Sequence, residues 1–103
     1  MQNHLFVVSE DEFFEARKVV DDDIQRALQV TAERIRHYHE RQLENTIRSF
    51  DCGDTSQIVS PIRRVGLYVP GTETVYPSSV LHTAIPAVVA GVDEIVITSP
   101  VSL

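Results

Sequence analysis

Apolar and polar residues recur along this chain with two different periods, and the change of period divides it into two parts. Between residues 9 and 43, apolar positions recur every three or four residues, as they do along one face of a helix. From residue 65 onward, short β-branched runs stand on either side of a second stretch with helical spacing. The pattern predicts an α/β fold, with N-terminal helices followed by a strand, a helix and a strand.

Two helices are predicted before residue 45. Ser9 and Glu12 have the spacing of a capping box, which begins a helix after Ser9; the apolar run at residues 5–8 precedes it as a strand end or a hydrophobic staple. The second helix is predicted from about Asp23 to Leu43, because an acidic triplet suits the positive end of its dipole. Its apolar stripe is expected to contain Ile24, Leu28, Thr31, Ile35, Tyr38 and either Gln42 or Leu43.

The stretch from residue 45 to residue 60 is predicted to fold back on itself as a short β-hairpin. Residues 46–50 and 57–60 are the arms, and residues 51–54 (Asp-Cys-Gly-Asp) have the composition of a turn. Residues 1–60 are therefore predicted to form a helical lead with a short β-hairpin. Residues 61–103 are predicted to form the βαβ portion of a nucleotide-binding-type domain. Both pieces are expected to belong to one larger domain.

The βαβ portion is delimited by turn and cap residues. A strand at residues 65–69 is stopped by the Pro-Gly pair at residues 70–71. The following helix is expected to use the serine pair, Ser78 and Ser79, as its cap and to end at Gly91, where a left-handed backbone needs no Cβ. Glu94–Thr98 is the second strand. A crossover of this length predicts that the two strands are parallel.

Composition and charge narrow the class of protein. The 103 residues allow one small domain, and 43% hydrophobic with 23% charged residues is typical of a globular protein. A net charge of −6 disfavours nucleic acid and anionic membrane surfaces as partners. Cys52 is the single cysteine, so neither an intrachain disulfide nor a cysteine zinc cluster can form. Without a membrane-spanning run or a signal-peptide pattern, a cytoplasmic location is expected.

Three runs of sequence carry a resemblance to a known family. They are RVGLYVPG at residues 64–71, YPSSVL at residues 76–81 and AIPAVVAGV at residues 84–92. In this order and spacing they resemble histidinol dehydrogenase, the zinc- and NAD-dependent enzyme that ends histidine biosynthesis. Residues 32–42 are also similar to that family's helix ending in an aromatic-His-Glu-x-Gln run. The resemblance covers nearly the whole chain, but only part of the family's length.

The resemblance implies a fold and an activity. The fold would be an incomplete Rossmann-like parallel sheet of the aldehyde dehydrogenase-like superfamily. The activity would be oxidation of L-histidinol to L-histidine with two NAD, by an enzyme that is a homodimer when full length. In the family, the zinc ligands, the glutamate–histidine acid/base pair and the histidinol contacts all lie beyond the position of Leu103. The chain is therefore expected to be a partial copy, with no catalytic or metal-binding residue and no activity alone.

One position is carried over as a candidate site residue. A tyrosine at the position of Tyr68 contacts NAD in the family, and a strand's carboxyl end is where open α/β sheets bind ligands. The opposing interpretation is an ordinary half-buried strand tyrosine. The loop that follows departs from the family, because Thr72 stands where a second glycine is usual and Glu73 is acidic. Strong phosphate binding by this loop is therefore not expected.

The remaining polar residues are weaker candidates. Ser78 and Ser79 could present free backbone N–H groups to an anion, although a role as a helix cap is favoured. The four histidines, His4, His37, His39 and His82, are scattered, and no zinc site is expected from them. Two other functions stay open at this point: a related alcohol dehydrogenase of the same superfamily, and a non-catalytic module that kept the βαβ scaffold.

Overall fold

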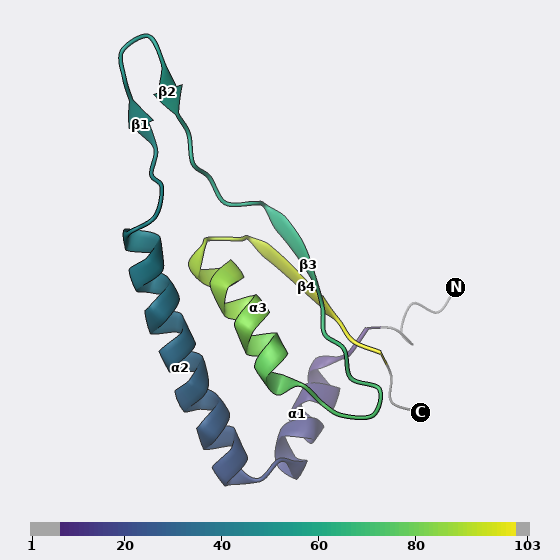
Figure 1. The fold of residues 1–103 in the computed structure, drawn as a ribbon. Helices are drawn as coiled ribbons and strands as arrows, with labels where there is room; N and C mark the ends of the chain where they lie inside the picture. Colours follow the sequence, from purple (N-terminus) through teal and green to yellow (C-terminus); the bar gives the residue numbers. More distant parts are fainter. Residues whose placement is uncertain (1–6, 101–103) are drawn as a thin grey trace, which may run out of the picture. The chain divides into compact units, whose positions relative to one another are not determined.

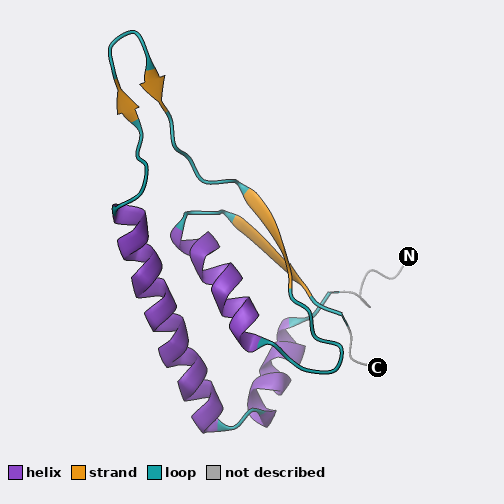
Figure 2. Cartoon of the chain, in the orientation of Figure 1, coloured by secondary structure: helices purple, strands orange, loops and turns teal. Residues whose placement is uncertain are grey.

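The computed structural model describes residues 7–100. His4 and the first two residues of the apolar run at residues 5–8 lie outside the described residues, while Val7 and Val8 lie in no helix or strand. By internal contacts the chain divides into two units, Met1–Val30 and Thr31–Leu103. Its elements, shown in Figures 1 and 2, are α1 (Glu10–Val19), α2 (Asp22–Glu44), β1 (Phe50–Asp51), β2 (Ser56–Gln57), β3 (Arg64–Tyr68), α3 (Pro77–Val89) and β4 (Glu94–Thr98). The predicted mixture of helices and strands is confirmed, while the division at residue 60 stays a prediction.

Hydrogen bonds at both ends define α1. The capping box is confirmed: the Ser9 amide donates to Glu12 Oε2 at 2.7 Å, and the Glu12 amide donates to Ser9 Oγ at 3.3 Å. The hydrogen bonds from the Ser9 backbone and then from its side chain lower the pKa of Glu12. At the other end, the Gln25 amide group donates to the carbonyls of Arg17 at 2.9 Å and Val20 at 2.8 Å. These bonds satisfy carbonyls that a helix end leaves free.

The face of α2 that is least exposed differs from the predicted stripe. Ile24 and Tyr38, which the apolar pattern selected, are 51% and 64% exposed. The two stripes share Leu28 and Ile35. The observed one is rotated by about one residue, and its half-buried members are Gln25, Leu28, Ala32, Ile35 and His39. The predicted stripe began at the apolar Ile24, whereas the half-buried face begins at the neighbouring Gln25 and includes a small Ala and a His that an apolar pattern does not select.

The hairpin is confirmed, although its strands are shorter than predicted. Strands β1 and β2 pair antiparallel, with Phe50 opposite Gln57 and Asp51 opposite Ser56. Gly53 has a φ of 76°, and its amide donates to Asp51 Oδ1 at 3.0 Å, so the turn uses both the glycine and the aspartate. Side chains also join the two arms: the Val59 amide donates to Ser49 Oγ at 2.8 Å, and Gln57 Nε2 donates to the Arg48 carbonyl at 3.0 Å.

The β3–α3–β4 unit is built as predicted. Strands β3 and β4 are parallel and in register from Arg64 opposite Glu94 to Tyr68 opposite Thr98, and α3 lies along the pair (Figure 1). The Val69 amide continues the ladder by donating to the Thr98 carbonyl at 2.8 Å.

The start of α3 differs from the prediction that a serine caps this helix. Tyr76 is the N-cap, and its side chain makes no capping hydrogen bond. Pro77 occupies the first turn, because its fixed φ suits a helix and its missing N–H is not needed there. Ser78 and Ser79 consequently lie inside the helix, where the Ser79 amide donates to the Tyr76 carbonyl at 3.1 Å.

The end of α3 confirms the role predicted for Gly91. Its φ is 87°, in the left-handed region. The Gly91 amide donates to the Val88 carbonyl and the Val92 amide donates to the Ala87 carbonyl, both at 3.0 Å. This pair of bonds is a Schellman motif, which turns the chain sharply from α3 into β4.

The two faces of β3 have different environments. Val65 and Leu67 are half-buried on the face toward α3. Within residues 7–100, Val69 and Ile85 are the only buried hydrophobic side chains, at 4% and 7% exposure. Gly66 lies on the opposite, exposed face. The small core therefore lies between α3 and one face of the β3–β4 pair.

Candidate functional site

Tyr68 is the last residue of β3 and lies at the carboxyl end of the parallel pair. Its side chain is 67% exposed and shares the open face of the sheet with Gly66. Among residues 7–100, its hydroxyl has no hydrogen-bond partner. The tyrosine is therefore not a core residue of this chain, and both its ring and its hydroxyl are available to a ligand or to another polypeptide.

The loop after β3 passes close to the end of β4. A Cβ at Gly71 would lie 3.3 Å from the Thr74 carbonyl oxygen and 3.8 Å from Ser99 Oγ, so a glycine suits this turn. Its φ is not in the left-handed region; within the described residues only Gly53 and Gly91 have a positive φ.

The first turn of α3 contains Ser78 and Ser79. The Ser79 carbonyl accepts a hydrogen bond from the Thr83 hydroxyl at 2.7 Å. Because the cap is Tyr76, neither serine has the capping role that the sequence favoured. Binding of an anion at this turn, the less favoured alternative in the sequence, is untested.

Two histidines that are far apart in the sequence line the same cleft. His39 of α2 and His82 of α3 border a hollow of about 290 Å³ together with Arg34, Ile35 and Tyr38. The ring of His39 meets Tyr38 edge-on, with 5.2 Å between ring centroids. Sequence reasoning missed this pair, because it depends on how α2 and α3 pack and no local pattern encodes that packing.

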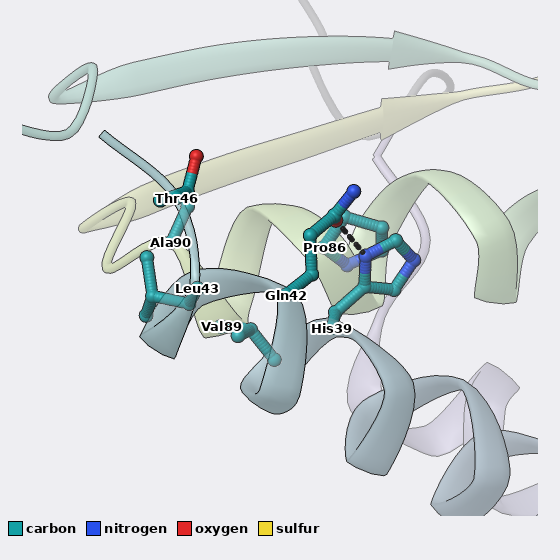
Figure 3. A pocket seen from close by; sticks show the side chains of 7 residues that line it. All are labelled: His39, Gln42, Leu43, Thr46, Pro86, Val89 and Ala90. Atoms are coloured by element: carbon teal, nitrogen blue, oxygen red, sulfur yellow. Dashed lines mark hydrogen bonds between the residues drawn. The ribbon is translucent and has the colours of Figure 1, made fainter.

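A second hollow, of about 240 Å³, lies beside the first and is shown in Figure 3. His39 borders this one too, and its Nδ1 lies 2.9 Å from Gln42 Oε1. Pro86 of α3 faces the same space (Figure 3). The lining is mostly aliphatic; its residues are His39, Gln42, Leu43, Thr46, Pro86, Val89 and Ala90.

The described residues do not fit a zinc ion. Within residues 7–100, no three His, Cys, Asp or Glu side chains are close enough to share a metal ion. Cys52 is exposed at the hairpin turn. A catalytic zinc needs three protein ligands, so this part of the chain does not hold one. The same residues include no helix that is long and apolar enough to cross a bilayer.

Comparison with known proteins identifies the family. A sequence model described as histidinol dehydrogenase matches residues 1–102. The chain belongs to the histidinol dehydrogenase family. This confirms the resemblance carried by the three sequence runs.

Two relatives and one solved structure give the extent of the similarity. The histidinol dehydrogenase of Natronomonas pharaonis is 45% identical over 91 residues, which are 87% of this chain and 22% of the relative. That of Pseudomonas aeruginosa is 53% identical over 76 residues, 72% of this chain and 17% of the relative. The crystal structure of histidinol dehydrogenase from Elizabethkingia anophelis superimposes with a TM-score of 0.81 at 29% identity, over 94% of this chain and 23% of that one. The chain thus spans about a fifth of the length of these relatives.

Proposed function

We propose that this chain is part of a cytoplasmic, NAD-dependent histidinol dehydrogenase that oxidises L-histidinol to L-histidine. The observation that carries the proposal is the family match over residues 1–102, which includes the run RVGLYVPG with Tyr68 at the carboxyl end of β3. The name histidinol dehydrogenase on both relatives supports this substrate over that of a related alcohol dehydrogenase. On this proposal, β3–α3–β4 is part of a Rossmann-like sheet of the aldehyde dehydrogenase-like superfamily, and the complete enzyme is a homodimer.

The proposed reaction is two successive oxidations. L-Histidinol first becomes L-histidinal, with one hydride passed to NAD⁺ and one proton released. The aldehyde then takes up water and passes a second hydride to a second NAD⁺, which leaves the carboxylate of L-histidine and releases two further protons. NAD, when bound, supplies the hydride-accepting ring. On the family resemblance, the zinc ligands and the glutamate–histidine pair are assigned to parts of the enzyme outside this chain.

Tyr68 is the residue of this chain that we assign to the cofactor. Its exposed ring offers a flat surface to a planar group, and its hydroxyl can donate or accept one hydrogen bond. Its place at the carboxyl end of a parallel strand is where open α/β sheets bind nucleotides. Tyr68 would thus position NAD without taking part in proton transfer.

A chimera tests the proposal. In it, this chain replaces the matching segment of the Pseudomonas aeruginosa enzyme, and the rates with histidinol are compared with those for other polar alcohols at saturating NAD. We expect NADH formation with histidinol from the chimera and none from the 103-residue chain alone. A folded chimera that prefers another alcohol would support the related alcohol dehydrogenase. A folded chimera inactive with every alcohol would support the non-catalytic scaffold.

A further inference from the structure

Arg34 is a cation that its own helix leaves unpaired. Three other cations of α1 and α2 form ion pairs with a carboxylate three residues away; they are Lys18, Arg26 and Arg41. None of the four residues that lie three or four positions from Arg34 is acidic; they are Val30, Thr31, His37 and Tyr38. Within residues 7–100, the Arg34 guanidinium forms neither a hydrogen bond nor an ion pair. Its charge is therefore available to a ligand.

The cleft that Arg34 borders has no acidic side chain in its lining, which consists of Arg34, Ile35, Tyr38, His39 and His82. His82 is the only ionisable residue of α3, so that helix brings no carboxylate to the cleft. The chain as a whole carries a net charge of −6, which makes this basic lining a local exception. A hollow lined by one sign of charge concentrates ligands of the opposite sign, and each imidazole adds a positive charge when it is protonated. The lining therefore selects an anion.

The arrangement of the donors favours a phosphate group over a carboxylate. Arg34 presents its guanidinium fork from α2, and His82 presents an imidazole from α3. Donors on two sides suit the tetrahedral oxygens of a phosphate better than the single plane of a carboxylate. The cleft has a volume of about 290 Å³, at the small end of ligand sites. Ile35 and the ring of Tyr38 add an apolar wall beside the donors, against which a small organic group can lie.

We propose that the cleft of His39 and His82 binds a phosphate group, either free phosphate or that of a small phosphomonoester. Arg34 supplies the permanent charge, and His82 donates a hydrogen bond from the facing helix. His39 Nδ1 lies 2.9 Å from Gln42 Oε1 and is engaged there, so His39 offers its Nε2–H to a phosphate oxygen when the ring is protonated. This is a statement about binding and does not rest on the proposed oxidation of histidinol.

A titration followed by NMR tests the site in the free chain. Inorganic phosphate and phenyl phosphate are added at fixed pH, and the ring protons of three histidines are observed. We expect saturable shifts at His39 and His82 and none at His37, which is on α2 but outside the lining. Arg34→Ala should weaken binding at least about tenfold, because a charge-assisted contact is lost. The control Arg36→Ala makes the same change in net charge outside the lining and should leave the affinity within about twofold.

Three further comparisons identify the ligand. Tighter binding of phenyl phosphate than of inorganic phosphate would point to a phosphomonoester, and equal binding to free phosphate. Benzoate has the same ring with a carboxylate, and tighter binding of benzoate than of phenyl phosphate would overturn the assignment to phosphate. His82→Gln should weaken the binding of phenyl phosphate severalfold, and an unchanged affinity would remove α3 from the site.

Other results would overturn the site itself. One is the absence of saturable shifts, and another is a shift of His37 as large as those of His39 and His82. Equal effects of Arg34→Ala and Arg36→Ala would reduce the binding to long-range charge. In the chimera we expect the same affinity, and a folded chimera that binds no phosphate would show that the remainder of the enzyme fills the cleft. A chimera that binds phosphate but forms no NADH contradicts only the proposed function.

Discussion

Substitution of Tyr68 separates a role in cofactor binding from a role in stability. Because the side chain is 67% exposed, Tyr68→Ala in the free chain should change the free energy of unfolding by no more than about 0.5 kcal/mol, as is usual for surface positions. A buried aromatic residue would instead cost about 3–5 kcal/mol when truncated. If Tyr68 binds NAD as proposed, Tyr68→Phe in the chimera should remove one hydrogen bond to the cofactor, worth about 0.5–1.5 kcal/mol, or roughly twofold to tenfold in affinity. Tyr68→Ala should weaken NAD binding further, because the ring contact is lost as well.

The assay measures melting temperature in the free chain and NAD affinity in the chimera. Tyr38→Phe is the matched control, because Tyr38 is similarly exposed, at 64%, but lies on α2. It should leave NAD affinity unchanged. Unchanged affinity in both Tyr68 variants would refute the assignment of this residue to the cofactor. A large loss of stability in the free chain would show that the ring is buried in solution.

Three further predictions concern the ends of helices α1 and α3. Gln25→Ala removes the side chain that caps the end of α1 and should lower the free energy of unfolding by about 1 kcal/mol in denaturant titrations. The control Gln29→Ala, on the same helix as Gln25, should not lower it, and equal effects of the two substitutions would contradict the capping role. Hydrogen bonds from the N-cap residue lower the pKa of Glu12. The contribution of the Glu12 carboxylate to helicity is therefore present above about pH 4.3 and is lost as the pH falls through the lower, folded-state pKa. Circular dichroism should show a weaker acid-induced loss of helicity for Glu12→Gln than for the parent chain, and an identical loss would count against this role of Glu12. Gly91→Ala places a side chain at a φ of 87° and should lower the free energy of unfolding by about 1–2 kcal/mol. Gly66→Ala should leave the stability unchanged. Similar melting temperatures for the two variants would refute the argument from the backbone conformation of Gly91.

Features decided by local chemistry could be predicted from the sequence. The capping box needs only Ser9 and Glu12 at the right spacing, and the Schellman turn needs only a glycine at position 91. The strands at residues 64–68 and 94–98 followed from short β-branched runs bounded by turn residues, and the long crossover predicted their parallel pairing.

Features that depend on packing or on a choice between neighbouring residues could not be predicted. On α2, Ala32 and His39 are half-buried, whereas the more hydrophobic Ile24, which the apolar pattern selected, is exposed. At the start of α3, Pro77 begins the helix one residue before the serine pair. The shared cleft of His39 and His82 arises from the packing of α2 against α3, which no short-range pattern encodes.

The position of Tyr68 was predictable, since a strand ending at Pro70 places it at the carboxyl edge of the sheet. Its exposure was not, because the sequence alone left open whether Tyr68 contacts a cofactor or is a half-buried strand tyrosine. The structure leaves the Gly66–Tyr68 face of β3 open.

The stoichiometry of NADH formed per histidinol consumed tests the central claim most directly. The chimera is supplied with a limiting amount of L-histidinol and excess NAD, and the reaction is followed to completion. A histidinol dehydrogenase forms two NADH for each histidinol and leaves L-histidine as the product. One NADH per alcohol with an aldehyde as the product, or no NADH from a folded chimera, would contradict the proposed function.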